Sequence, residues 1–190
     1  PTTMLHVGLP DLIDRIRKTL RVRCDVHMES HPNHVTAENL RSIKAIGVQH
    51  LSIGVESLVD RHLKTLCRPY TAEAARESVR RAVAAGFSCV NVDVMFGLPG
   101  QTCDEVAETG RELVKLGVDQ VAAYPIFLFP YTRMGSENGH ANHGIMQSLK
   151  RRRMLRILEN IFYEAGYERS SVWAFTRKGV PRYCSVTVPA

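Results

Sequence analysis

Three short stretches of the chain alternate apolar and polar residues, and each carries a carboxylate near its C-terminal end. They are DVHMES (25–30), HLSIGVES (50–57) and CVNVDVMFGLPG (89–100). Because successive side chains of a strand point to opposite faces, each stretch predicts a strand with one polar face. The residues predicted to share that face are His27, Glu29, Ser52, Glu56, Asn91 and Asp93.

A helical pattern follows each of these strands, which indicates βα units in a parallel sheet. Ligands of such arrays bind at the carboxyl ends of the strands. Glu29, Glu56 and Asp93 are therefore the first candidates for a binding site. Together with Tyr124 they recur about every 30 residues, the length of one βαβ step.

The apolar periodicity and the capping residues predict the remaining elements. Thr36 and Thr102 are good N-caps, and Gly47, Gly86 and Gly117 are natural helix ends. We expect helices at 9–20, 36–47, 59–66, 71–85, 102–116 and 144–165, and strands at 24–30, 51–56, 89–96, 118–127 and, at an edge, 167–175.

The polar face distinguishes the expected fold from a closed barrel of eight strands, whose interior is filled with branched apolar side chains. A wider or open barrel that holds a polar ligand inside accounts for the pattern better. The fold class predicted is α/β, a partial parallel β/α barrel resembling a TIM barrel.

Composition limits the function classes. The chain has 190 residues, 44% of them hydrophobic, which is enough for a substantial core. The net charge of +6 is spread over several helices, so we expect no nucleic-acid partner. We also expect no membrane span, no signal peptide and a cytoplasmic location. The five cysteines are scattered and odd in number, so they indicate reduced thiols and no metal site.

Several motifs occur in an order typical of one known family. They are ESHP (29–32), LSIGVES (51–57), LCRPY (66–70), VNVDVMFGLPGQT (90–102) and AAYP (122–125). In this order the chain resembles the radical S-adenosylmethionine (SAM) enzymes related to oxygen-independent coproporphyrinogen III oxidase. The resemblance implies a [4Fe-4S] cluster that cleaves SAM to a deoxyadenosyl radical, a small-molecule substrate, and an electron donor such as flavodoxin or ferredoxin.

The cluster of that family is held by a CxxxCxxC motif, and no such motif occurs in these residues. The resemblance therefore implies the central part of a longer enzyme, inactive by itself. Residues 1–140 would form the central part of the barrel. Residues 141–190 would form its last helix and the start of a C-terminal region.

The resemblance also assigns roles in cofactor binding. Glu29 would accept hydrogen bonds from the ribose hydroxyls or the ammonium group of SAM, Arg68 would pair with its carboxylate, and Asp93 would bind the ribose hydroxyls. The plainer alternatives are a solvated strand-end Glu29 and a surface Arg68. For Asp93, a buried carboxylate without a ligand would need a cation.

Three further residues are implied to lie near the ligand. Met95 would line the adenine side of the pocket or pack in the core, and alternation does not decide whether Tyr124 or Pro125 points inward. The GLPGQT turn at 97–102 lacks the lysine of a phosphate-binding loop and predicts a tight turn instead.

Glu56 departs from the family pattern, in which glutamine is usual. In the oxidase that position approaches a second SAM, and a carboxylate there suits the branches that transfer methyl or methylene groups. The expected chemistry is therefore methyl or methylene transfer or oxidative decarboxylation, on a tetrapyrrole or a natural-product intermediate. The alternative is a heme-binding chaperone of the same family that does not turn over substrate.

Overall fold

The computed structural model describes residues 8–21, 24–127, 129, 131, 136 and 145–184. Its centre is a six-stranded sheet with the strand order β1-β2-β3-β4-β6-β5. The strands are β1 (Val26–Ser30), β2 (Val48–Glu56), β3 (Cys89–Phe96), β4 (Gln120–Pro125), β5 (Tyr167–Arg169) and β6 (Ala174–Arg177). The first four are parallel, and β6 runs antiparallel to both β4 and β5.

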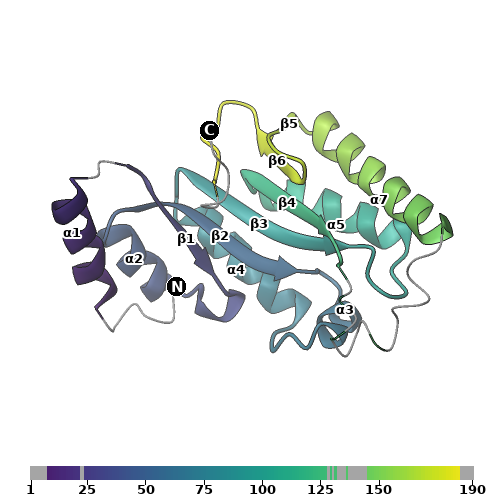
Figure 1. The fold of residues 1–190 in the computed structure, drawn as a ribbon, viewed down its shortest axis with the longest axis horizontal. Helices are drawn as coiled ribbons and strands as arrows, with labels where there is room; N and C mark the ends of the chain where they lie inside the picture. Colours follow the sequence, from purple (N-terminus) through teal and green to yellow (C-terminus); the bar gives the residue numbers. More distant parts are fainter. Residues whose placement is uncertain are drawn as a thin grey trace.

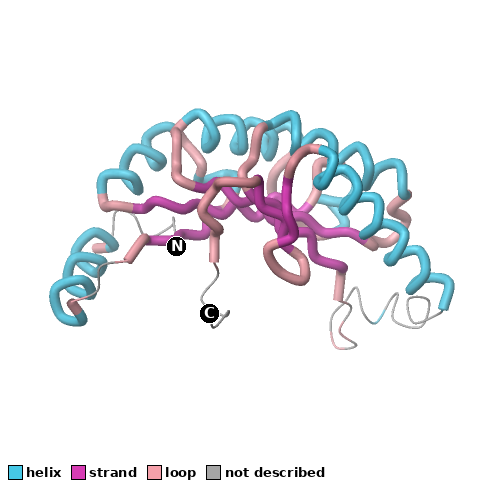
Figure 2. The backbone as a smooth tube through the Cα atoms, turned by 90° about the horizontal axis from the view of Figure 1, so that it is seen from above, coloured by secondary structure: helices cyan, strands magenta, loops and turns pink. Residues whose placement is uncertain are grey.

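Helices cover one face of the sheet, which curves around an open concave face (Figures 1 and 2). They are α1 (Leu9–Leu20), the 3-10 turn η2 (Pro32–His34), α2 (Ala37–Ala45), α3 (Asp60–Thr65), α4 (Ala72–Ala84), α5 (Cys103–Leu116) and α7 (Ile145–Glu164). The sheet does not close on itself within the described residues, so the prediction of a partial β/α barrel is confirmed.

Alternation along β2 explains how one strand serves two environments. Leu51, Ile53 and Val55 are fully buried under the helices and belong to the hydrophobic core. His50 and Ser52 point to the concave face and are also buried, at 1% exposure each. A polar face that is nonetheless buried must be satisfied internally or by a ligand.

Capping predictions from the sequence are confirmed. The side chains of Thr36 and Thr102 accept hydrogen bonds from the backbone N–H groups of Asn39 and Glu105, and Thr102 with Glu105 forms a capping box. In the turn before α5, Gly97 and Gly100 adopt positive φ angles of 75° and 69°. The 97–102 segment is therefore a tight strand-to-helix turn, as its sequence predicts.

The last predicted strand is wrong in one respect. The structure has a hairpin, β5 and β6, where the sequence predicts a single strand over 167–175. The backbone N–H of Ser170 donates to the carbonyl of Ala174 (2.9 Å), and the Ser171 hydroxyl accepts from the N–H of Ala174 (3.2 Å). These local serine contacts turn the chain, so β6 pairs with β4 and β5 lies at the edge. The predicted start of the long helix at Gly144 lies outside the described residues.

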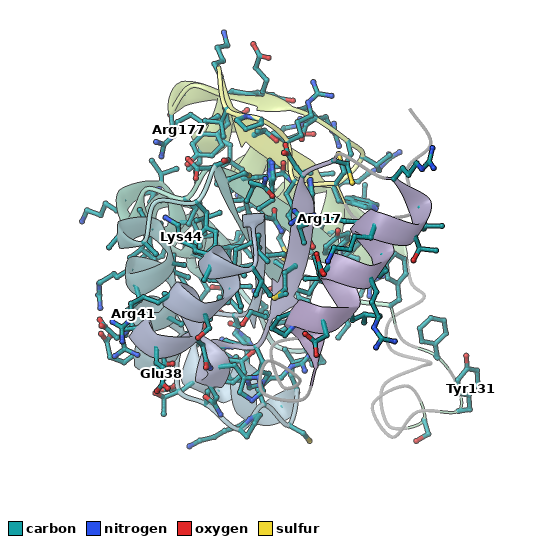
Figure 3. All side chains as sticks on the ribbon, turned by 90° about the vertical axis from the view of Figure 1, so that its left-hand side faces the viewer. Arg17, Glu38, Arg41, Lys44, Tyr131 and Arg177 are labelled. Carbon is teal, nitrogen blue, oxygen red and sulfur yellow. The ribbon has the colours of Figure 1, made fainter. Side chains whose placement is uncertain are left out.

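Two neighbouring helices carry basic side chains, Arg17 on α1 and Arg41 and Lys44 on α2 (Figure 3). Lys44 is partly used structurally, since its ammonium group donates to the carbonyl of Gly86 (3.0 Å) at the end of α4. Among the described residues, no helix is long and apolar enough to cross a membrane.

Candidate functional site

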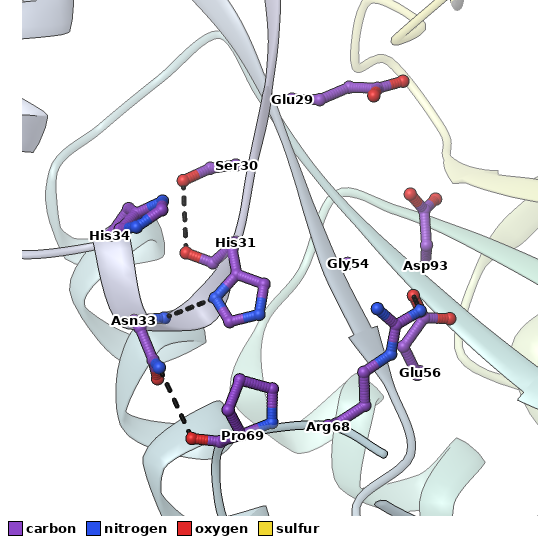
Figure 4. Close-up of a pocket in the computed structure, with 10 residues that line it drawn as sticks. All are labelled: Glu29, Ser30, His31, Asn33, His34, Gly54, Glu56, Arg68, Pro69 and Asp93. Carbon is purple, nitrogen blue, oxygen red and sulfur yellow. Dashed lines mark hydrogen bonds and ion pairs between the residues drawn. The ribbon is translucent and has the colours of Figure 1, made fainter. Parts of the chain in front are cut away.

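A pocket of about 610 Å³ lies at the carboxyl ends of β1, β2 and β3, and we call it the carboxyl-end pocket (Figure 4). Four residues predicted from the sequence line it, Glu29, Glu56, Arg68 and Asp93. The other lining residues are Ser30, His31, Asn33, His34, Gly54 and Pro69. The predicted convergence of the three strand-end carboxylates is thus observed.

Asp93 lines this pocket, and two neutral side chains hold its carboxylate by hydrogen bonds. Ser52 Oγ donates to Asp93 Oδ2 (3.1 Å), and Asn91 Nδ2 donates to Asp93 Oδ1 (2.8 Å). Burial raises the pKa of Asp93 to about 6, and these two hydrogen bonds partly counter the increase. The charges of Glu56 and Glu29 raise the same pKa further, because they disfavour a third negative charge nearby.

Glu56 reaches the pocket in a different way. Simple alternation places it opposite Met95, but the register shifts between Gly54 and Glu56, and Glu56 lies opposite Val94. Its φ angle is 62°, a left-handed conformation that a non-glycine residue adopts at some cost. Glu56 lies on the polar face, as alternation predicts, with Val55 in the core, but a β-bulge shifts its pairing with β3, which the sequence does not predict.

Arg68 pairs with Glu56 across the mouth of the pocket. Arg68 Nη2 lies 2.7 Å from Glu56 Oε1, and the two side chains are 34% and 14% exposed. Burial raises the pKa of Glu56, whereas the charge of Arg68 lowers it. Arg68 Nε is buried and has no hydrogen-bond partner among the described residues, so one donor of the guanidinium remains available.

Tyr70 holds the bulge, and sequence reasoning did not single it out beyond its place in the LCRPY motif. Its hydroxyl donates to the carbonyls of Gly54 (2.9 Å) and Val55 (3.1 Å). Burial raises its pKa to about 12, which keeps the hydroxyl protonated and donating. His31 packs edge-on against the Tyr70 ring at 4.9 Å. Tyr70 thus holds the backbone of the strained segment that carries Glu56.

The remaining predicted residues lie on β3 and β4. In the parallel ladder Met95 pairs with Tyr124 and Phe96 pairs with Pro125. Paired residues share a face, so Tyr124 lies on the concave face with Met95, and Pro125 lies on the helix-covered face with Phe96. Met95, Tyr124 and Pro125 do not line the carboxyl-end pocket. Tyr124 instead lines a second cavity, which also contains Glu29 and Asp93.

The histidines at positions 27, 31, 34 and 50 form two separate groups. His31 and His34 line the carboxyl-end pocket, whereas His27 stacks on His50 with ring centroids 4.1 Å apart. No group of three potential metal ligands exists among the residues that the structure describes. Trp173 packs against the core, with its ring centroid 6.3 Å from that of Phe96.

Comparisons with known proteins agree with this geometry. The family model of the Radical SAM superfamily matches residues 2–113, which is more than half of the chain. The chain therefore belongs to the radical SAM superfamily.

Two relatives within this superfamily are similar to the chain in sequence. The heme chaperone HemW of Bacillus subtilis is 30% identical over 135 residues, covering 70% of this chain and 36% of HemW. The oxygen-independent coproporphyrinogen III oxidase of Paracoccus denitrificans is 26% identical over 184 residues, covering 94% of this chain and 39% of the oxidase.

A solved structure shows the same fold. Coproporphyrinogen III oxidase (HemN) from Escherichia coli, a radical SAM enzyme, superimposes with a TM-score of 0.72 at 22% sequence identity. The match covers 90% of this chain and 40% of HemN. The chain thus spans 36% to 40% of the length of these three proteins.

Proposed function

We propose that the carboxyl-end pocket binds S-adenosylmethionine. The observation that carries the proposal is that one pocket contains a half-buried carboxylate, Asp93, and a guanidinium, Arg68, whose buried Nε has no partner among the described residues. SAM offers matching groups, because its ribose hydroxyls are donors and its carboxylate is an acceptor. The pocket volume of about 610 Å³ is within the range of ligand sites.

Each of these residues contacts a different group of the bound SAM. Asp93 accepts hydrogen bonds from the ribose hydroxyls, Arg68 binds the carboxylate, and Glu29 accepts from the ribose or the ammonium group. Met95 and Tyr124, on the concave face beside the pocket, border the adenine side, whereas Pro125 lies on the helix-covered face and does not contact the ligand. Binding transfers Arg68 from Glu56 to the ligand, so Glu56 becomes free to attract a second positive group.

We propose that a [4Fe-4S] cluster completes the site with cysteines other than those described here. Cys24, Cys67, Cys89, Cys103 and Cys184 are free thiols, and no group of three candidate ligands occurs in the described part of the chain. Such a cluster, given one electron by the reductant, would supply the reductive cleavage of SAM to methionine and a deoxyadenosyl radical. Residues 1–140 then act as the central part of the barrel, and 141–190 as its last helix and the start of a C-terminal region.

For the whole protein we propose radical-initiated methyl or methylene transfer, with oxidative decarboxylation as the alternative reaction. Glu56 supports the first, because a carboxylate attracts the ammonium or sulfonium of a second SAM better than the usual glutamine does. The substrate class is a tetrapyrrole or a natural-product intermediate. The electron donor is a flavodoxin or a ferredoxin, and the location is the cytoplasm.

The test uses the full-length protein, reconstituted with iron and sulfide under anaerobic conditions and supplied with SAM and a reductant. Deoxyadenosine together with S-adenosylhomocysteine is the expected result for group transfer. Deoxyadenosine alone would favour oxidative decarboxylation. If no cleavage product forms on a protein shown to carry its cluster, the enzymatic proposal fails.

A second candidate, a heme-binding chaperone, is favoured by one observation, the 30% identity to HemW. It predicts one heme bound per full-length protein and no SAM cleavage. Absorbance titration with heme, run beside the cleavage assay on the same preparation, separates the two functions.

A further inference from the structure

A second cavity lies on the concave face of the sheet, beside the carboxyl-end pocket, and we call it the inner cavity. Its volume is about 290 Å³. It shares Glu29 and Asp93 with the carboxyl-end pocket and is otherwise lined by Asn91, Gln120, Ala122, Tyr124, Ser170, Ser171, Ala174, Arg182, Tyr183 and Cys184. The strands β3, β4 and β6 form its base.

Residues 181–184, which we call the strap, form one wall of the inner cavity. Gln120 Nε2 donates to the carbonyl of Tyr183, and the N–H of Tyr183 donates back to Gln120 Oε1, both at 3.0 Å. The N–H of Cys184 donates to His27 Nδ1 (3.2 Å). The strap is therefore tied to both β4 and β1, and the cavity is preformed.

Asn91 supplies an acceptor that the protein leaves unused. The residue is 1% exposed, and Nδ2 donates to Ser52 Oγ and Asp93 Oδ1, both at 2.8 Å. Oδ1 is buried and has no hydrogen-bond partner among the described residues. Because Nδ2 faces β2 and Asp93, Oδ1 faces the opposite way, toward the β4 side where the cavity lies. A buried acceptor without a donor is unfavourable unless a ligand satisfies it.

The charged groups that line the cavity are two carboxylates and one guanidinium. Glu29 and Asp93 contribute carboxylates, and their charges raise the pKa values of both Tyr124 and Tyr183, beyond the larger effect of burial. The two carboxylates therefore face two phenol rings across a small space. The one cation among the lining residues is Arg182, which is exposed.

We propose that the inner cavity binds a protonated amine of the substrate. The ammonium group donates to Asn91 Oδ1 and to the carboxylates of Glu29 and Asp93, and the rings of Tyr124 and Tyr183 flank the cation. This inference deepens the proposed function, because it rests on the pocket next to it being the SAM site. The volume admits a small amine or one arm of a larger substrate.

The test compares three probes of similar size on the full-length protein without SAM. They are phenethylamine, 2-phenylethanol and phenylacetate, which present a cation, a neutral hydroxyl and an anion on the same scaffold. Binding is followed by ligand-observed NMR. We expect phenethylamine to bind at least about ten-fold more tightly than 2-phenylethanol, because hydrogen bonds to charged groups are the stronger class. Phenylacetate is expected not to bind.

Two variants locate the binding. Ala174→Leu fills the inner cavity from β6 and should abolish phenethylamine binding while SAM binding, measured by calorimetry, is retained. Arg68→Ala should do the reverse, because Arg68 lines only the carboxyl-end pocket of the two. This pair separates failure of the amine site from failure of the SAM site.

A third variant avoids any folding problem caused by Ala174→Leu. Arg182→Glu changes an exposed side chain at the rim and should raise the affinity for phenethylamine several-fold. Each of three results would overturn the proposal. In the first, phenylacetate binds as tightly as phenethylamine, and in the second, Arg182→Glu leaves the affinity for phenethylamine unchanged. In the third result, SAM displaces phenethylamine and Ala174→Leu does not weaken phenethylamine binding.

Discussion

Two carboxylates of the same pocket, Asp93 and Glu56, are held by opposite means. Asp93 lies within a regular strand and is fixed by the neutral donors of Ser52 and Asn91. Glu56 ends its strand on a bulge with a φ of 62° and is balanced by the charge of Arg68. Neutral donors leave a carboxylate in place without cancelling its charge, whereas an ion pair is exchanged when a ligand brings its own charge.

This difference suggests a fixed and a switchable half of the site. The Asp93 half keeps its geometry whether or not a ligand is bound. The Glu56 half changes partner when an anionic group of the ligand takes Arg68. Four measurements test this division, from the largest expected effect to the smallest.

Asp93→Ala should abolish turnover of the full-length protein while leaving the fold intact. Two charge-assisted hydrogen bonds to ribose hydroxyls, each worth about 1.5–3 kcal/mol, are lost, which weakens SAM binding by about 100-fold or more. Calorimetry gives the affinity and circular dichroism the fold. Full activity of a folded Asp93→Ala protein would remove Asp93 from the site.

The raised pKa of Asp93 predicts a pH-dependent stability. A carboxyl whose pKa in the folded state is about 6, above the usual 3.8, contributes stability below pH 3.8 that is lost as the pH rises through 6. The loss is at most about 3 kcal/mol, the shift of about two pKa units multiplied by about 1.4 kcal/mol.

Asp93→Asn is the matched control for this effect, because its amide does not titrate. The difference in midpoint temperature between the wild type and Asp93→Asn should change between pH 4 and pH 7, with the wild type relatively more stable at pH 4. A constant difference across this range would show that Asp93 ionises normally.

The sequence predicts the Asp93 half of the site better than the Glu56 half. Period-two alternation places Ser52, Asn91 and Asp93 on one face, and the ladder confirms it by pairing Ser52 with Asn91. Alternation gives the correct face for Glu56 but not its register shift or its left-handed φ, which occur where Tyr70, 16 residues from Gly54, binds the strand backbone. A local pattern does not contain such a tertiary constraint.

The same reasoning explains the inner cavity and the C-terminal hairpin. The strap residue Tyr183 is hydrogen-bonded to Gln120, which lies 63 residues earlier, and no periodicity in the sequence predicts that contact. The serine turn between β5 and β6 was likewise not predicted, because strand-forming residues lie on both sides of it. Helices with capping residues, such as α5, were predictable because the N-cap Thr102 and the C-cap Gly117 directly flank the helix in the sequence.

Arg68→Ala should weaken SAM binding by about 2 kcal/mol, or about 30-fold, because the ligand carboxylate loses its charged donor. Arg68→Lys is the matched control and should restore only part of the affinity, since an ammonium does not reproduce the planar fork of a guanidinium. Equal affinity of Arg68→Ala and the wild type would show that Arg68 does not contact the ligand.

Tyr70→Phe tests the support of the bulge and carries the smallest effect, about 1 kcal/mol of stability for the lost hydrogen bonds. The ring and its contact with His31 are kept, so packing changes little. If Tyr70 positions Glu56, the variant should also alter the Glu56 carboxyl titration observed by NMR, whose pKa burial raises in the wild type. Glu56→Gly relieves the left-handed strain and should make the stability less sensitive to Tyr70→Phe, as a double-mutant cycle would measure. Strict additivity of the two substitutions would mean that the hydroxyl of Tyr70 supports the backbone without governing Glu56.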